Sequence, residues 1–133
     1  MKKYLFEILM SAIALVALAV PLNGAQLTDQ NKQFLTAYEK VHHALAADDL
    51  SGAKAAAGEL GSDGQELAKS DSLKTARAAF EKLSSRAKQL AAGQSGYYAF
   101  HCPMLNKDWV QTSTTVANPY GGKAMADCGE IQK

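Results

Sequence analysis

The chain has 133 residues, with 14 Lys or Arg against 13 Asp or Glu, which gives a formal net charge of +1 at pH 7. Neither sign of charge is clustered, and this excludes the strongly basic or acidic surfaces with which proteins bind nucleic acid or anionic membranes. Without the leader described next, about 108 residues are left, a length that suits one small domain.

Residues 1–25 have the pattern of a secretory signal peptide. Two lysines near the start precede an apolar run, Ile8–Val20, which is short for a membrane span. We expect cleavage after Ala25, with residues 17–19 as an alternative cut. The leader predicts export, to the periplasm in a Gram-negative cell, with no membrane attachment once it is removed. That compartment permits disulfides.

The first stretch with helical spacing follows the leader. Thr28 or Asp29 is a suitable N-cap. The apolar positions then step by four, three and four residues, as on one face of an amphipathic helix. They are Phe34, Tyr38, Val41 and Leu45.

The second stretch begins near Asp49 and has a thin, mostly alanine stripe. Gly58, Gly61 and Gly64 each cost about 1 kcal/mol relative to alanine inside a helix. Either the helix breaks around 61–64, or these small residues let a neighbouring helix approach closely.

The third stretch has the clearest periodicity. It can start with Asp71 or Ser72 as the cap, and Gly93 ends it. Its apolar positions alternate three and four apart: Leu73, Ala76, Phe80, Leu83, Ala87 and Leu90. Three helices with short links predict a mainly α fold, an up-down-up bundle over residues 26–93.

Residues 94–133 are poorer in alanine and richer in aromatic residues. We interpret 97–101 and 109–112 as short extended segments, and Gly121 and Gly122 as a turn. This part is too small for a core of its own. It is therefore predicted to be an irregular C-terminal cap that packs its aromatic residues on the bundle, within the same domain.

The cap holds every sulfur atom outside the leader. The sequence runs Cys102-Pro103-Met104 and then Met125-Ala126-Asp127-Cys128. Cys102 and Met104 can project from the same side if the extended backbone persists through Pro103. One helical turn would place Met125 and Cys128 on one face. Thiolates and thioethers are soft donors that select Cu(I)-type metals.

A disulfide between Cys102 and Cys128 is the alternative, and it is the usual state of two cysteines in an exported protein. It would stabilise the fold by roughly 3 kcal/mol and would leave the methionines as core fillers. The disulfide alone does not explain why methionines flank both cysteines.

His101 and His42 are further candidate nitrogen ligands. His101 adjoins Cys102, although in a regular strand it points the other way. His42 falls beside Leu35 at the edge of the apolar stripe, and His43 falls near the wet face. We find no credible serine nucleophile, paired catalytic carboxylates, phosphate loop or zinc-type histidine spacing, so we expect no enzymatic activity.

The tail resembles a bacterial domain family of unassigned function. That family occurs as exported single-domain proteins and as an extension on the periplasmic adaptors of Cus-type copper/silver efflux pumps. The helical half is similar as well, and the resemblance covers nearly all of the mature chain. His101 stands where the family more often has an aromatic residue. The matching segments are 43–50, Phe100–Met104, Asp108-Trp109, Asn118-Pro119-Tyr120 and Met125-x-x-Cys128-Gly129.

The resemblance implies heavy-metal handling without turnover of a substrate. Its candidate ligands are Cys102, Met104, Met125 and Cys128. We therefore expect a periplasmic carrier or buffer of Cu(I) or Ag(I), with an efflux adaptor or another metal-handling protein as partner. The rival hypothesis is a disulfide-stabilised helical interaction module that binds no metal.

Overall fold

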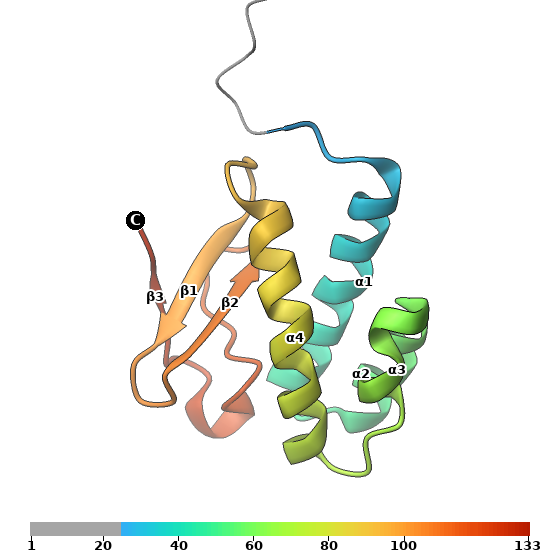
Figure 1. Ribbon diagram of the computed structural model, residues 1–133. Helices are drawn as coiled ribbons and strands as arrows, with labels where there is room; N and C mark the ends of the chain where they lie inside the picture. The colour runs from blue at the N-terminus through green and yellow to red at the C-terminus, as the bar shows by residue number, and fades with distance from the viewer. Residues whose placement is uncertain (1–24) are drawn as a thin grey trace, which may run out of the picture.

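The computed structural model describes residues 25–133 (Figure 1). The predicted signal peptide therefore lies almost wholly outside the described residues. Within them, no helix combines the length and the apolar character needed to cross a membrane.

Four α-helices and a short 3-10 helix make up the first part of this region. They are α1 (Asp29–Ala46), α2 (Leu50–Gly58), η1 (Gly61–Gly64), α3 (Gln65–Ala68) and α4 (Leu73–Ala91). Thr28 caps α1 by accepting a hydrogen bond from the Asn31 N–H, and Ser72 caps α4 through a capping box with Thr75.

The C-terminal part is a three-stranded antiparallel sheet. Its strands are β1 (Tyr98–Cys102), β2 (Lys107–Gln111) and β3 (Glu130–Ile131), in the order β2-β1-β3. A second 3-10 helix, η2 (Gly122–Met125), lies in the connection from β2 to β3. Figure 1 shows the sheet on one side of α4, with α2 and α3 on the other side, while α1 and α4 run in opposite directions.

The prediction of a three-helix bundle with an irregular cap is wrong in two places. The second helical stretch is broken into α2, η1 and α3, because Gly61 has a positive φ of 58° and Gly64 approaches the Ala57 carbonyl. A Cβ at Gly64 would lie 1.9 Å from that oxygen. The expected extended segments also pair as a hairpin, which β3 then extends into a sheet.

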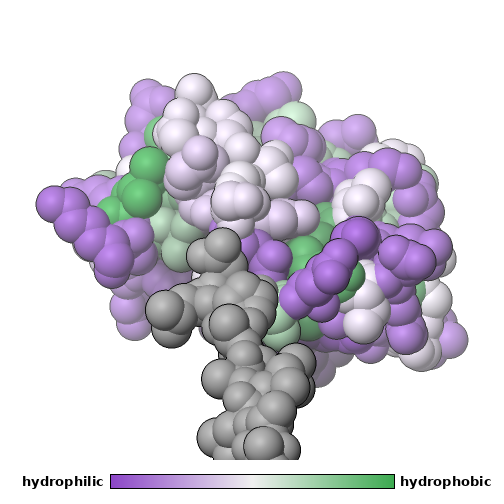
Figure 2. Space-filling model, turned by 90° about the horizontal axis from the view of Figure 1, so that it is seen from above, coloured by the Kyte–Doolittle hydropathy of each residue, from purple (hydrophilic) through white to green (hydrophobic). Residues whose placement is uncertain are grey.

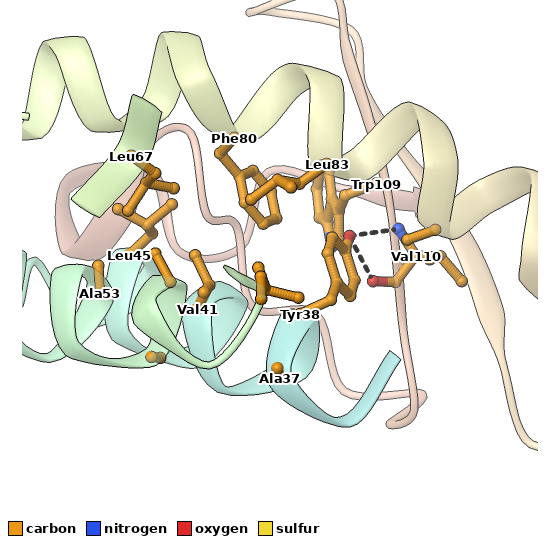
Figure 3. Close-up of a cluster of buried hydrophobic side chains, with 14 of the residues drawn as sticks. Ala37, Tyr38, Val41, Leu45, Ala53, Leu67, Phe80, Leu83, Trp109 and Val110 are labelled. Atoms are coloured by element: carbon orange, nitrogen blue, oxygen red, sulfur yellow. Dashed lines mark hydrogen bonds between the residues drawn. The ribbon is translucent and has the colours of Figure 1, made fainter. Parts of the chain in front are cut away.

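The core lies between the helices and the sheet. Figure 3 shows Phe80 and Leu83 of α4 pointing toward Tyr38, Val41 and Leu45 of α1. The Tyr38 hydroxyl donates to the Val110 carbonyl at 2.9 Å and accepts from the Val110 N–H at 3.3 Å. Burial raises the pKa of Tyr38, so the hydroxyl keeps its proton and can donate this bond. It thereby joins α1 to β2.

Hydrophobic side chains are sparse on the outside of the molecule. The face seen in Figure 2 is largely hydrophilic, with hydrophobic residues in small separate areas. Among the described residues, the large hydrophobic side chains that are exposed are Met104, at 78%, and Ile131, at 46%.

Arg77 of α4 ties three parts of the chain together. Its guanidinium donates to the Leu45 carbonyl at 2.9 Å, the Pro119 carbonyl at 2.8 Å and the Asp48 carboxylate at 2.6 Å. These bonds hold the end of α1 and the loop before η2 against α4. The hydrogen bond from Arg77, followed by one from the Lys123 N–H, lowers the pKa of Asp48.

Arg77→Met should destabilise the protein by about 2–3 kcal/mol in urea unfolding at neutral pH, because two backbone carbonyls lose a charged donor. Lys82→Met, which removes only an exposed ion pair with Glu66, is the matched control and should cost less than about 1 kcal/mol. An equal loss in both variants would contradict the role of Arg77.

The pH dependence of stability, compared between wild type and Arg77→Met, gives a second test. The pKa of Asp48 is lowered in the folded state, so its contribution to stability is complete above its unfolded pKa of about 3.9 and is lost as the pH falls through the lower folded value. The stability gap between wild type and Arg77→Met should therefore narrow in acid.

Candidate functional site

The two cysteines form a disulfide that joins β1 to the segment after η2. Cys102 is the last residue of β1 and is fully buried, whereas Cys128 is half-buried; their Cα atoms are 5.2 Å apart. The structure thus contains the cysteine pair that the sequence left as an alternative to a thiolate site. The bridge closes a loop across 26 positions of the chain.

Met104, Met125 and Cys128 line one surface groove with a volume of about 520 Å³. Met104 projects from the turn between β1 and β2, and Met125 ends η2 and packs partly on the core. Charged side chains share the groove, namely Lys123, Asp127 and Glu130. Three of the four predicted sulfur ligands therefore line one groove.

The fourth, Cys102, is bonded to Cys128 but is fully buried and does not line the groove. The sequence allowed Cys102 and Met104 to share one side only if the extended backbone persisted through Pro103. Instead β1 ends at Cys102, and the turn that follows contains Asn106 with a positive φ of 50°. Cys102 therefore faces the core while Met104 faces solvent.

Met125 and Cys128 lie in a continuous turn. The Cys128 N–H donates to the Met125 carbonyl at 3.0 Å, which continues the backbone curvature of η2. Because this spacing brings both side chains to the same edge, both residues line the groove.

Asn118 anchors the chain behind the groove. Its buried side chain donates to the Cys128 carbonyl at 2.9 Å and accepts from the N–H groups of Tyr120 and Gly121. One amide therefore fixes both the turn at Asn118-Pro119-Tyr120 and the position of Cys128. The residues of this turn therefore support the structure and do not line the groove.

Trp109 of β2 packs against the residue that follows Cys128. It stacks on Phe100 with ring centroids 5.6 Å apart, and its Nε1–H donates to Gln111 Oε1 at 2.9 Å. Gly129 lies against the indole, where a Cβ would come within 2.8 Å of the ring. The close approach explains a glycine directly after Cys128.

His101 is not in the groove. It lies on the opposite face of β1 from Cys102 and pairs with Asp108, with 2.6 Å between its Nδ1 and the carboxylate oxygen. Hydrogen bonds from Lys88 first and His101 second lower the pKa of Asp108. His101, a predicted nitrogen ligand, therefore pairs with a carboxylate and not with the sulfur residues.

His42 also lies away from the groove, but it is in an unusual setting. It is fully buried in α1, and its Nε2 is 2.7 Å from the Ala117 carbonyl. Its Nδ1 has no hydrogen-bond partner among the described residues. Burial lowers the pKa of His42, against the opposing effect of Glu39.

One neighbour of His42, Glu39, is not among the candidate residues from the sequence. The Glu39 side chain is only 15% exposed and lies beside His42 and His43. The available signal was the helical spacing i, i+3, i+4 of these three residues, which puts them on adjoining positions of one helix surface.

No protein-family model, curated protein sequence or solved structure matches this chain. The resemblance to a family of exported domains therefore stays a prediction, and so do the metal, the compartment and the partner that it implies.

Proposed function

We propose that the protein binds Cu(I) or Ag(I) in the groove lined by Met104, Met125 and Cys128, and acts in the periplasm as a carrier or buffer of the metal. It turns over no substrate. An efflux adaptor or another metal-handling protein is the partner that receives the metal.

The observation that carries this proposal is the position of Met104. A methionine that fills the core is buried, but this side chain is 78% exposed in the same groove as Met125. An exposed, flexible apolar side chain adds little to stability, whereas two thioethers in one groove suit a soft monovalent metal.

The disulfide is the metal-free, oxidised state in this proposal. A dithiol reductant would supply two electrons and two protons, giving two thiols and an oxidised reductant. Cu(I) or Ag(I) would then displace the thiol protons, so that affinity falls at acid pH. The oxidised protein keeps the two thioethers alone, which predicts weaker binding.

Anaerobic titration of Cu(I) against a competing chelator tests the proposal. The reduced protein should bind more tightly than the oxidised one. Met104→Leu combined with Met125→Leu should weaken binding in both states by at least about tenfold, which is about 1.4 kcal/mol. Leucine keeps the volume and removes the thioether sulfur.

Lys123→Gln is the matched control, because it changes the same groove without removing sulfur. It should leave Cu(I) affinity within about twofold, which is less than 0.5 kcal/mol. Unchanged affinity in the double leucine variant would remove the thioethers from the site. Failure of the reduced wild type to bind would end the proposal.

The disulfide favours a second candidate, an interaction module that is held together by Cys102–Cys128 and binds no metal. Oxidised cysteines are not thiolate ligands, and the bridge fastens η2 and β3 to β1. This candidate predicts that only the oxidised protein binds a partner. It also predicts that Cu(I) does not change the affinity for that partner.

A further inference from the structure

A second group of potential ligands lies on α1, apart from the sulfur residues. Glu39, His42 and His43 each offer one ligand atom, and these atoms all lie within 4.8 Å of one another. The Glu39 Oε1 is 3.3 Å from the His43 Nε2 and 3.7 Å from the His42 Nδ1.

The buried histidine is oriented toward this group. A carbonyl can only accept, so the contact between His42 Nε2 and the Ala117 oxygen fixes the proton on Nε2. In the neutral ring the lone pair is then on Nδ1, the atom without a hydrogen-bond partner among the described residues. An unpaired buried acceptor costs about 1–3 kcal/mol, so it calls for an explanation.

The carboxylate is also held in place. Glu39 Oε1 accepts from the Thr112 N–H at 3.2 Å and from its hydroxyl at 3.0 Å. An ordinary ion pair between Glu39 and His43 would account for the exposed histidine, but it leaves the buried Nδ1 lone pair unused. Metal-binding histidines commonly donate their other N–H to a backbone carbonyl, and ligating carboxylates are commonly hydrogen-bonded.

We propose that Glu39, His42 and His43 form a site for a divalent transition metal of the Zn²⁺ type, separate from the sulfur groove and with a fourth position open to solvent. Two imidazoles and one carboxylate are nitrogen and oxygen donors that suit Zn²⁺ and not the soft Cu(I).

The two distances from the carboxylate fit this metal. Tetrahedral zinc holds such ligands at about 2.0–2.2 Å and therefore about 3.3–3.6 Å from one another. The distances of 3.3 and 3.7 Å from Glu39 Oε1 to the two histidines are close to that edge length. His43 is 61% exposed, which leaves the metal a route from solvent.

Calorimetric titration of Zn²⁺ into the oxidised, tag-free mature protein tests the site. One equivalent should bind, and His43→Ala and Glu39→Gln should each weaken binding by at least about tenfold. His43 is exposed and Gln can still accept the Thr112 bonds, so both variants should fold. His101→Ala, which removes another partly exposed histidine beside a carboxylate, is the matched control and should bind as wild type does.

Nitrogen NMR of the histidine rings separates coordination from a structural role. Zn²⁺ should change the ¹⁵N chemical shift of His42 Nδ1. The His42 Nε2 should keep its proton and its hydrogen bond to the Ala117 carbonyl. The Met104→Leu, Met125→Leu double variant should bind Zn²⁺ normally, which keeps this test independent of the sulfur groove. No binding at millimolar Zn²⁺, or wild-type affinity in both His43→Ala and Glu39→Gln, would overturn the site, as would binding that is lost in His101→Ala.

Discussion

Trp109→Ala is expected to destabilise the protein by about 3–5 kcal/mol, the usual cost of deleting a buried indole. The ring is fully buried, stacks on Phe100 and meets Tyr120 edge-on at a centroid distance of 6.4 Å. Its removal also leaves Gln111 Oε1 without the indole donor. Urea unfolding measures the loss, which is a large share of the 5–15 kcal/mol typical of a whole domain.

Met104→Ala is the control, because Met104 lies in a neighbouring motif segment but is exposed. It should change the free energy of unfolding by less than about 0.5 kcal/mol. If Trp109→Ala does not fold, Trp109→Phe should still fold with an intermediate loss. A loss at Met104 as large as that at Trp109 would mean that the methionine is structural and would remove the main support for the proposal that the groove binds metal.

The helices that the sequence predicted well are those with a complete apolar stripe. α1 and α4 were both foreseen with their caps, Thr28 and Ser72 being among the candidates, because the stripe and the cap point to the same start. The second stretch stayed undecided between one helix and a break around 61–64, because its alanines could serve either one long helix or several short ones. What decided it was a contact over seven positions, between Gly64 and the Ala57 carbonyl.

The sheet was beyond the reach of local patterns. The segments that became β1 and β2 were recognised as extended, but strand pairing is a relation between segments. β3 has only two residues and is defined by Glu130 and Ile131 pairing with His101 and Phe100 of β1. A strand of two residues is too short to show periodicity, so no sequence pattern could have predicted it.

The candidate sites divide in the same way. Met125 and Cys128 are three positions apart, so one turn is enough to group them. Met104 is far from them in sequence, and it reaches the same groove because the chain brings Cys102 against Cys128. Placing Glu39 required knowing that Thr112, 73 positions away, would hold its carboxylate. Only the long-range hydrogen bonds from Thr112 distinguish Glu39 from an ordinary residue on the helix surface.

Removing the disulfide is the second large expected effect. Cys102→Ala combined with Cys128→Ala should lower the free energy of unfolding by about 3–4 kcal/mol, as expected for a bridge that closes a loop of this length. The chain should still fold, because Asn118 holds the Cys128 segment and Arg77 holds the loop before η2. Thermal unfolding of the oxidised wild type, the reduced wild type and this variant measures the effect.

Ag(I) added to the same three proteins links stability to function. A ligand raises stability according to its concentration relative to its dissociation constant in the folded state. If Cys102 and Cys128 bind as thiolates, Ag(I) should recover much of the loss in the reduced wild type and little in the double alanine variant. Since unfolded thiols also bind Ag(I), the recovery is a lower bound on folded-state binding. Equal stabilisation of the oxidised and reduced proteins by Ag(I) would mean that the two thioethers are the only ligands. The disulfide would then be a permanent structural bond that does not control metal binding.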